Sequence, residues 1–203
     1  MALRAVFFDV GETLVDEERY WCEVAAIAGL RPHLVLAALG FTIARGEEHG
    51  SLWGHLGVER PAQVADVVYS RDDLYPDALP CLQAVAAAGY VVGAAGNQTA
   101  ALEEWTRREG LPFDIVTSSV SLGARKPAAA FFERLVALAG LKPRQVAYVG
   151  DRVDYDVLPA AAAGLVAIHV RRGPWGRLQE TPAEATLAVD ELASLPQALA
   201  SLL

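Results

Sequence analysis

The sequence predicts an α/β fold, in which a parallel β-sheet is covered by helices on both faces and a small all-helical cap follows the first strand. Two observations lead to this prediction. Short apolar runs alternate with longer helical patterns along most of the 203 residues, and such alternation is typical of a parallel sheet covered on both faces. The alternation is interrupted between residues 16 and 75, where only helical patterns occur.

Six short apolar runs are predicted to be buried strands. They cover residues 5–8, 91–95, 115–117, 146–149, 166–170 and 187–189. Helical patterns lie between them at residues 80–88, 100–109, 128–139 and 157–163. These patterns are followed by glycines of the kind that end helices: Gly89, Gly110, Gly140 and Gly164.

The segment that interrupts the alternation has helical patterns at residues 19–28, 33–44 and 61–69. The run at residues 75–77 ends this segment, because the residue before Pro76 is restricted to extended backbone. We therefore predict a core domain formed by residues 1–15 and 76–203, and a helical cap formed by residues 16–75. The cap begins directly after the first strand, so we expect it to cover the ends of the strands.

Composition and charge limit the classes of partner. Hydrophobic residues make up 53% of the chain and the formal net charge is -8, so there is enough apolar material for a core and no basic bias toward nucleic acid or an anionic membrane. Two cysteines, Cys22 and Cys81, do not make a disulfide framework and favour a reducing compartment. The first apolar run is too short for a signal peptide, and no apolar stretch is long enough to span a bilayer. We expect a cytoplasmic protein.

Polar residues cluster where the predicted strands end. The clusters are residues 9–13, 96–98, 150–156 and, just before a helix, 125–127. In open parallel sheets, ligands bind outside the carboxyl ends of the strands, which share one edge. We therefore expect clusters that are far apart in the sequence to meet at a single site.

The side chains in these clusters suit one kind of chemistry. Asp9 and Asp151 offer the oxygen ligands that Mg²⁺ prefers, and Lys126 offers a positive charge beside them. Asn97 offers amide donors and Thr13 a hydroxyl to an anionic substrate. A carboxylate such as Asp9 can also act as a nucleophile and carry a phosphoryl group.

At these positions the chain resembles the haloacid dehalogenase (HAD) superfamily of aspartate-nucleophile hydrolases, and the resemblance covers nearly the whole chain. The first family motif, Asp-x-Asp-x-Thr, matches residues 9–13 except at Gly11. The second matches at Asn97 but has Gly96 in its hydroxyl position. The third matches at Lys126, and the fourth at residues 150–156. The resemblance implies a Rossmann-like sheet and a helical (C1-type) cap between the first two motifs.

The resemblance also implies roles for individual residues. Asp9 would be the nucleophile and a metal ligand, and Lys126 would orient it and meet the phosphoryl group. The main-chain carbonyl of Gly11 and the Asp151 carboxylate would also bind the metal, with Asp156 either binding it or holding a metal-bound water. Three residues would bind the phosphoryl group: Thr13, Asn97 and Lys126. The implied activity is that of a Mg²⁺-dependent phosphatase of small phosphorylated molecules, acting through an aspartyl-phosphate.

Two departures from the motifs bear on activity. Gly11 lacks the carboxylate with which family phosphatases protonate the leaving group and later activate water, a contribution of about 10²–10⁴ in rate. Gly96 lacks a hydroxyl donor. Without the acid, aryl and acyl phosphates should be favoured over alkyl phosphates, because their leaving groups depart without a proton.

Few residues are candidates to replace this acid. Glu12 should point away from the site unless the backbone turns sharply there, because consecutive strand side chains face opposite sides. Four residues of the cap are expected to be solvated surface and are weak alternatives: Glu47, Glu48, His49 and His55.

Other polar and aromatic residues are predicted to be structural. Asp154 is expected to begin a helix, and residues 171–176 are expected to form a surface loop. Trp21 and Trp53 are expected to pack inside the cap. Two histidines without ligand-spaced partners are also expected to be structural: His33 and His169.

Two other functions stay open. A 2-haloacid dehalogenase would tolerate the missing acid, because halide leaves without a proton. That branch, however, usually has an aromatic residue in the place of Gly11 and needs an arginine, for which Arg19 is the only nearby match. A catalytically weakened protein that binds metal and a phosphorylated ligand, or a protein partner, would also fit Gly11 and Gly96. The sequence indicates neither the physiological substrate nor the oligomeric state.

Overall fold

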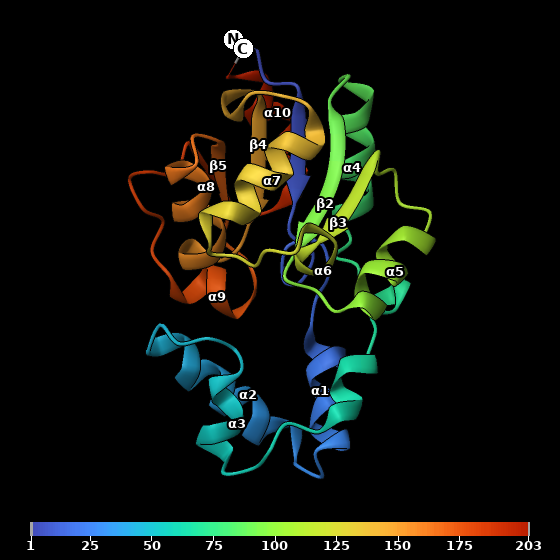
Figure 1. Cartoon of the computed structure of the whole chain (residues 1–203), viewed down its shortest axis with the longest axis vertical. Helices are drawn as coiled ribbons and strands as arrows, with labels where there is room; N and C mark the ends of the chain where they lie inside the picture. The colour runs from blue at the N-terminus through green and yellow to red at the C-terminus, as the bar shows by residue number, and fades with distance from the viewer. Residues whose placement is uncertain (1, 203) are drawn as a thin grey trace.

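The protein contains a six-stranded sheet in which all neighbouring strands are parallel (Figure 1). The computed structural model describes residues 2–202. The strands are β1 (Ala5–Phe8), β2 (Val91–Gly96), β3 (Ile115–Ser118), β4 (Val146–Gly150), β5 (Val166–Val170) and β6 (Leu187–Val189), in the order β3-β2-β1-β4-β5-β6. The predicted α/β fold is therefore confirmed. The strand order reverses between β1 and β4, and ligands of such sheets bind at this reversal, outside the carboxyl ends of the strands.

Helices cover both faces of the sheet (Figure 1). They are α4 (Ala78–Ala87), α5 (Ala100–Arg108), α6 (Ser119–Leu122), α7 (Ala129–Ala139), α8 (Leu158–Ala162) and α10 (Leu195–Ala200). Successive side chains of β1 point to opposite faces, so Phe8 packs in one core with Leu82 of α4, and Phe7 packs in the other with Phe131 of α7. Both faces are buried, which explains why the strand is apolar throughout.

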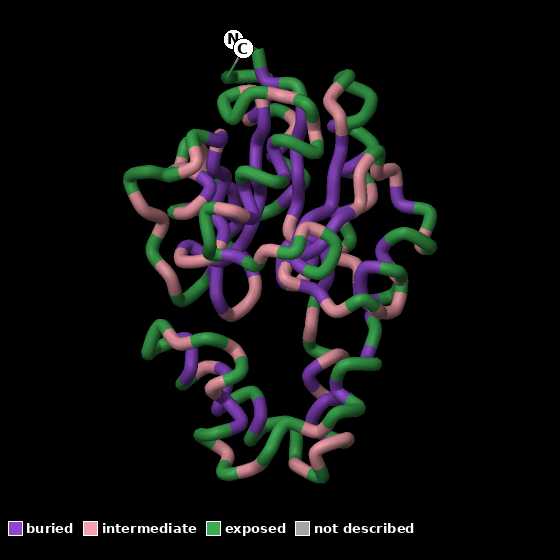
Figure 2. Tube along the Cα trace, in the orientation of Figure 1, coloured by how far each residue is buried: buried purple, intermediate pink, exposed green. Residues whose placement is uncertain are grey.

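Residues 16–75, called the inserted segment here, form a group of helices beyond the carboxyl ends of the strands (Figure 1). They comprise α1 (Glu18–Ile27), α2 (Pro32–Ala44) and α3 (Ser51–Leu56), then 3₁₀ turns at Ala62–Asp66 and Arg71–Asp73. The helix predicted at residues 61–69 is wrong beyond Asp66, because Val67 has extended backbone (ψ 127°), as β-branched residues favour. Parts of the segment are buried (Figure 2). Its small core includes Trp21 and Trp53 as predicted.

The helices of the described chain are shorter or less apolar than a membrane-spanning helix needs to be. Among residues 2–202, no single helix is long and apolar enough to cross a bilayer. The pair α1 and α2 would suffice by length and composition, but the two helices are bent by 113° at the break between them.

The inserted segment is joined to the sheet beside the carboxyl end of β1. Val15 forms bridges with Gly11 on one side and Leu74 on the other. The main-chain N–H of Tyr75 donates to the carbonyl of Leu14 at 3.0 Å. The chain that enters the segment and the chain that leaves it therefore run side by side next to the predicted site.

A second contact between the sheet layer and the inserted segment comes from α9 (Gly173–Leu178). The surface loop predicted at residues 171–176 is therefore wrong in its second half. Gly173 has a left-handed φ of 63°, which favours glycine, and Pro174 lies in the first turn, where a missing N–H breaks no helical bond. Trp175 is 2% exposed and packs in the core of the inserted segment, so this residue is anchored and not a surface feature.

Candidate active site

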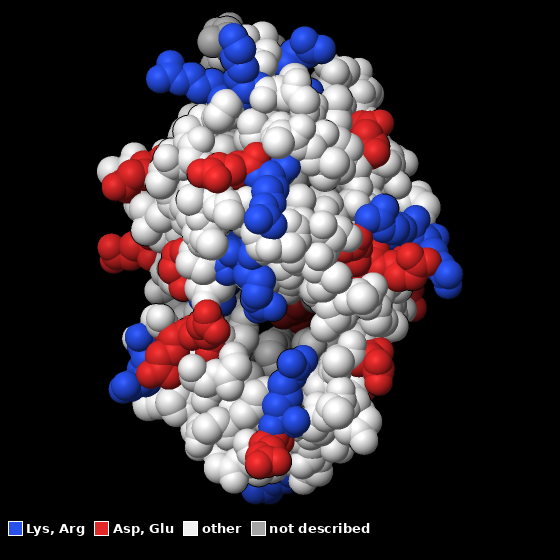
Figure 3. Space-filling model, viewed as in Figure 1, with Lys and Arg blue, Asp and Glu red and all other residues white. Residues whose placement is uncertain are grey.

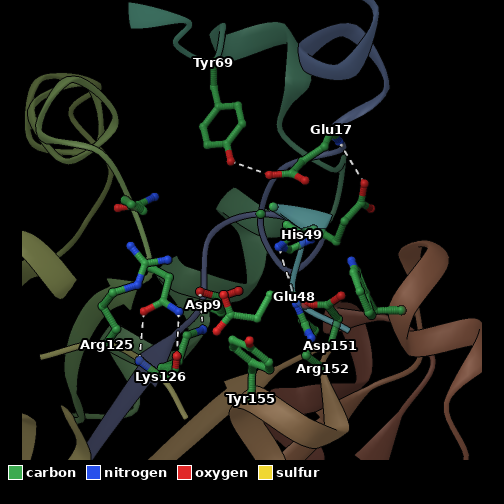
Figure 4. Close-up of a pocket in the computed structure, with 16 residues that line it drawn as sticks. Asp9, Glu17, Glu48, His49, Tyr69, Arg125, Lys126, Asp151, Arg152 and Tyr155 are labelled. Carbon is green, nitrogen blue, oxygen red and sulfur yellow. Dashed lines mark hydrogen bonds and ion pairs between the residues drawn. The ribbon is translucent and has the colours of Figure 1, made fainter. Parts of the chain in front are cut away.

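The predicted clusters bring charged side chains together at the carboxyl ends of β1 and β4. Lys126 Nζ lies 2.8 Å from Asp9 Oδ1 and 2.5 Å from Asp156 Oδ1. Asp9, Asp151 and Asp156 each place a carboxylate oxygen within 4.8 Å of the other two. Figure 4 shows Asp9, Lys126 and Asp151 together on one side of the cavity. Residues from three distant parts of the sequence therefore share one site, as their strand-end positions predict.

The electrostatics of this site are dominated by burial. Burial raises the pKa of Asp9 to about 6, although Lys126 lowers it, and the charge of Asp156 raises it further. Burial also raises the pKa of Asp151 well above its usual range, and the charges of Asp156 and Asp9 add to this effect. Burial alone would lower the pKa of Lys126, but Asp156 and Asp9 outweigh it, so that pKa is well above its ordinary value and the lysine stays charged.

An unpaired oxygen of Asp151 marks the place where a cation fits. Asp151 Oδ2 is buried and has no hydrogen-bond partner among the described residues, and leaving a buried carboxylate oxygen unpaired is unfavourable. Three carboxylates with one ammonium group leave two negative charges, which a divalent cation would balance. Carboxylate oxygens are ligands for hard cations such as Mg²⁺. The residues present therefore fit a divalent metal, whereas the identity of the ion and the ligand role of the Gly11 carbonyl stay predictions.

The substitution Asp151→Asn tests this interpretation without any assay of activity. It should raise the free energy of unfolding of the metal-free protein by about 1–3 kcal/mol, because it removes a buried charge. It should also abolish stabilisation by Mg²⁺, which in the wild type would reach about 2.7 kcal/mol at 100 times Kd. Thermal unfolding followed by circular dichroism, in EDTA and in Mg²⁺, measures both. Asp66→Asn is the control at an exposed position, and an unchanged Mg²⁺ effect in Asp151→Asn would exclude Asp151 as a ligand.

Thr13 lies outside the cavity and contacts the carboxylate of Asp151. It is fully buried, and its hydroxyl donates to Asp151 Oδ1 at 3.4 Å. The main-chain N–H of Leu14 donates back to the carbonyl of Val10 at 2.9 Å, so the chain turns under the strand end and takes Thr13 away from the cavity wall. In this structure Thr13 contacts Asp151 and does not line the cavity, and its contact with the substrate stays a prediction.

Asn97 fixes the main chain of Lys126. Its Nδ2 donates to the carbonyl of Lys126 and its Oδ1 accepts the N–H of the same residue, both at 2.9 Å. This reciprocal pair sets the direction from which Lys126 approaches Asp9. A contact between Asn97 and a phosphoryl group stays a prediction. It would use the second N–H of Nδ2, because the first donates to Lys126.

Asp156 uses both of its oxygens within the protein. One faces Lys126, and the other accepts the main-chain N–H of Arg152 at 2.9 Å. Gly150 permits this close packing, because a Cβ atom there would lie 2.3 Å from Asp156 Oδ2. These contacts make Asp156 the residue that holds Lys126 in place, and its part in metal binding stays a prediction.

The absence of a side chain at Gly96 has a local explanation. A Cβ atom at this position would lie 2.5 Å from Asp9 Oδ1, which is closer than non-bonded atoms approach. A serine or threonine there would have to displace the Asp9 carboxylate from its place beside Lys126. The glycine therefore does more than remove a donor, because it makes room for Asp9.

The inserted segment closes the cavity on the side opposite Asp9. The sheet layer contributes Asp9, Gly11, Glu12, Asn97, Gln98, Arg125, Lys126, Asp151, Arg152, Tyr155 and Trp175, and the inserted segment contributes Glu17, Glu48, His49, Gly50 and Tyr69. Figure 4 shows Glu17 and Tyr69 entering from that segment. On the outside, acidic and basic side chains are interspersed over the face shown in Figure 3.

Of the four alternative acids in the inserted segment, two reach the cavity. Glu47 and His55 bond each other at 2.7 Å and do not line it. Glu48 and His49 do line it. Glu48 is exposed to solvent as expected, whereas His49 is half-buried and differs from that expectation. Burial and the nearby charge of Arg152 lower the pKa of His49 to about 3, so its imidazole is neutral at physiological pH and is unsuited to be the acid.

Glu12 lies in the cavity wall instead of pointing away. Its φ of 53° shows that the backbone turns sharply after β1, which the strand periodicity does not indicate. Its carboxylate accepts the hydroxyl of Tyr75 at 2.7 Å and the main-chain N–H of Glu17 at 3.2 Å. Burial and the charge of Glu17 raise the pKa of Glu12 to about 8. One Glu12 oxygen therefore holds the start of the inserted segment at Glu17, and the other holds its end at Tyr75.

Glu17 is a carboxylate of the cavity that the sequence analysis missed. It lies just before α1, where Tyr69 and the indole of Trp21 both donate to its carboxylate. Burial raises the pKa of Glu17 to about 6, although these two hydrogen bonds lower it. One signal was available in the sequence, because a residue only six positions after Gly11, at the start of the first inserted helix, must stay close to the strand end.

Arg152 closes a further side of the cavity. Its guanidinium stacks between the rings of Tyr155 (3.6 Å) and Trp175 (3.7 Å) and forms a forked pair with Asp154 (2.6 and 3.1 Å). Asp154 lies in the first turn of the helical element Val153–Val157, in agreement with the predicted position at a helix start, but its side chain bonds Arg152 and does not cap the helix. His169 is buried and close to the carbonyl of Asp151 (3.1 Å), in agreement with a structural role.

Comparison with known proteins agrees with this arrangement. A family model described as haloacid dehalogenase-like hydrolase matches residues 3–164. A glyceraldehyde 3-phosphate phosphatase of Methanopyrus kandleri is 29% identical over 203 aligned positions, which cover 85% of this chain and 86% of the relative.

Two solved structures resemble the whole chain. One is a HAD phosphatase from Thermococcus onnurineus (TM-score 0.67, 19% identity, 97% of this chain and 98% of the other). The second is an L-2-haloacid dehalogenase (TM-score 0.69, 23% identity, 98% and 100%). At 19% and 23% identity, the similarity to these two structures is evidence for the fold only. The family match spans most of the chain and contains Asp9, Lys126, Asp151 and Asp156, and the protein therefore belongs to the haloacid dehalogenase-like hydrolase family.

Proposed function

We propose that this protein is a Mg²⁺-dependent phosphatase of small phosphorylated molecules and that Asp9 carries the phosphoryl group. The observation that supports this most strongly is the Asp9 carboxylate itself. One of its oxygens is held by Lys126 at 2.8 Å, the side chain is 14% exposed, and Asp9 lines the cavity. A fixed carboxylate with an open side is what a nucleophile needs.

The neighbouring residues have complementary parts in this proposal. Lys126 holds Asp9 and lies where it would also meet an oxygen of the phosphoryl group. Asn97 and Asp156 position Lys126, and Thr13 positions Asp151. A bound Mg²⁺ would offset the repulsion between the Asp9 carboxylate and an anionic substrate.

The inserted segment acts as a cap in this proposal, with the domain division at residues 1–15 and 76–203 against 16–75. Five of the cavity residues come from this segment, so it would exclude water from the reacting group and select the substrate. The name of the Methanopyrus kandleri relative makes glyceraldehyde 3-phosphate the first compound to test. We also place the enzyme in the cytoplasm, where such metabolites occur.

A dehalogenase function finds less support in the cavity. Arg19, the arginine nearest to the expected position, donates to both carboxylate oxygens of Asp73 (2.6–3.0 Å) and to the carbonyl of Val68. Its side chain does not line the cavity, so it is not placed to meet a substrate carboxylate or a departing halide.

The proposed function is tested by phosphate release from a panel of monoesters. The panel contains glyceraldehyde 3-phosphate, glycerol 3-phosphate, 4-nitrophenyl phosphate and acetyl phosphate, each with Mg²⁺ or with EDTA. We expect Mg²⁺-dependent release and, after acid quenching, a peptide phosphorylated at Asp9 by mass spectrometry. Absence of release from every compound, together with halide release from 2-chloro acids, would replace the phosphatase by a dehalogenase. If neither phosphate nor halide is released, the remaining function is that of a protein that binds metal and a phosphorylated ligand or a protein partner.

A further inference from the structure

The carboxyl group of Glu17 occupies the space above Gly11. A Cβ atom at position 11 would lie 2.3 Å from Glu17 Oε1, 2.9 Å from Glu17 Cδ and 3.2 Å from the hydroxyl oxygen of Tyr69. Non-bonded atoms do not approach to 2.3 Å, so a side chain at position 11 and the observed Glu17 exclude each other. The carboxyl group that is missing at position 11 is therefore replaced in space by that of Glu17, which enters the cavity from the inserted segment (Figure 4).

Three contacts fix the orientation of Glu17. The hydroxyl of Tyr69 donates to Oε1, and the indole N–H of Trp21 donates to Oε2 at 3.0 Å. The main-chain N–H of Glu17 donates to Glu12 Oε1 at 3.2 Å. None of these partners is a cation, so the carboxyl group is held without being tied into an ion pair. A side chain held in this way from several elements is suited to act on a reacting atom.

The other carboxyl groups that line the cavity are Asp9, Glu12, Glu48 and Asp151. Asp9 is the proposed nucleophile, and both oxygens of Glu12 accept hydrogen bonds. Asp151 accepts a hydrogen bond from Thr13, and its unpaired oxygen fits a metal ion. Glu48 is exposed to solvent. Glu17 alone among them replaces the side chain of Gly11 in space, and it lines the same cavity as the nucleophile.

We propose that Glu17 is the general acid and base of this enzyme and takes over the role for which position 11 has no side chain. This assignment rests on the proposed phosphatase function. It differs from a merely structural role, in which Glu17 would only join α1 to Tyr69.

The two half-reactions balance as follows. In the first, Asp9 forms a bond to phosphorus while the bond from phosphorus to the leaving oxygen breaks, and that oxygen takes the proton of the Glu17 carboxyl group and departs as an alcohol. In the second, the Glu17 carboxylate takes a proton from water as the water oxygen bonds to phosphorus. The bond between phosphorus and Asp9 then breaks. This step releases phosphate and regenerates the Asp9 carboxylate and the protonated Glu17 carboxyl group.

The variant Glu17→Gln separates proton transfer from structure, because the amide keeps the size of the side chain. With 4-nitrophenyl phosphate, which needs no protonation on departure, the variant should release one equivalent of nitrophenolate per site in a burst close to the wild-type rate. Turnover after the burst should be slower by about 10²–10⁴-fold, since the phosphoenzyme lacks its base. With glycerol 3-phosphate the burst itself should be slower by a similar factor. Rapid-quench measurement of the first turnover gives both rates.

A second set of variants moves the carboxyl group back to position 11. Gly11→Asp alone should not raise activity, because its side chain meets Glu17. Glu17→Gly should be slow, and the double variant Gly11→Asp/Glu17→Gly should hydrolyse glycerol 3-phosphate at least tenfold faster than Glu17→Gly. Glu18→Gln is the matched control, since it changes the adjacent, exposed glutamate of α1.

The outcomes separate this inference from the function on which it rests. If the wild type forms no phosphoenzyme and releases no phosphate, the phosphatase proposal is overturned and the role of Glu17 with it. If the wild type is active but Glu17→Gln slows the aryl and alkyl bursts equally, Glu17 is structural and only the inference is overturned. A double variant no faster than Glu17→Gly also overturns it, provided that circular dichroism shows the wild-type fold.

Discussion

Replacement of Asp9 by asparagine is expected to lower the turnover of phosphate monoesters by at least about 10⁴-fold, because an amide does not attack phosphorus. The nearby carboxylates cannot take its place, since Asp151 and Asp156 are each 1% exposed and Asp156 is used by Lys126. The variant should also fail to form a phosphoenzyme. Phosphate release at steady state and mass spectrometry after acid quenching measure the two effects.

The control for this variant is Asp66→Asn, which makes the same change at an exposed position of the inserted segment. It should keep wild-type turnover. If Asp9→Asn retained turnover within about tenfold of the wild type, water would be the nucleophile and the aspartyl-phosphate would be excluded.

Replacement of Lys126 by methionine is expected to affect both stability and activity. The lysine side chain is 4% exposed and faces Asp9 and Asp156, so its removal leaves buried carboxylates without their cation. Breaking a buried ion pair in this way lowers the free energy of unfolding by about 3–5 kcal/mol. Turnover should fall by about 10³-fold or more, because a preorganised positive charge at the phosphoryl group is lost. Urea unfolding in EDTA and steady-state assays in Mg²⁺ measure the two effects.

The sequence offers a matched control, because Lys142 is its only other lysine. Lys142 is exposed, so Lys142→Met should change stability by less than about 0.5 kcal/mol and leave turnover unchanged. Equal stability of Lys126→Met and the wild type would contradict the charge balance described for the site.

The fold was predictable because its signals are local. Each strand is a short apolar run, and a doubly covered parallel sheet needs no further information to define which residues are buried. The errors lie where a single residue changes the backbone. Glu12 adopts a left-handed φ that strand periodicity does not contain, and Gly173 with Pro174 starts a helix where the basic residues before it suggested a loop.

The candidate site was predictable to the level of which residues meet. Strand ends of a parallel sheet share one edge, so Asp9, Lys126 and Asp151 could be placed together. The hydrogen-bond partners of these residues could not be predicted, because hydrogen bonds between side chain and main chain depend on direction as well as position. The two hydrogen bonds between the Asn97 amide and the main chain of Lys126 are of this kind, and the side-chain hydrogen bond from Thr13 to Asp151 depends on direction in the same way. Glu17 was missed because it reaches the site from a different group of helices.

The bridges from Val15 to Gly11 and to Leu74 have a consequence for motion. They tie together the two chains that enter and leave the inserted segment, and Glu17 lies two residues from this tie. If the segment turns as a rigid lever about the tie, displacement grows with distance from the pivot. Glu17 would then move little, whereas His49, much farther along the segment, would move more and would separate from Trp175, against which its ring packs (4.8 Å between ring centroids). An opening for substrate exchange near His49 is thus compatible with a proton donor, Glu17, that stays in place beside the pivot.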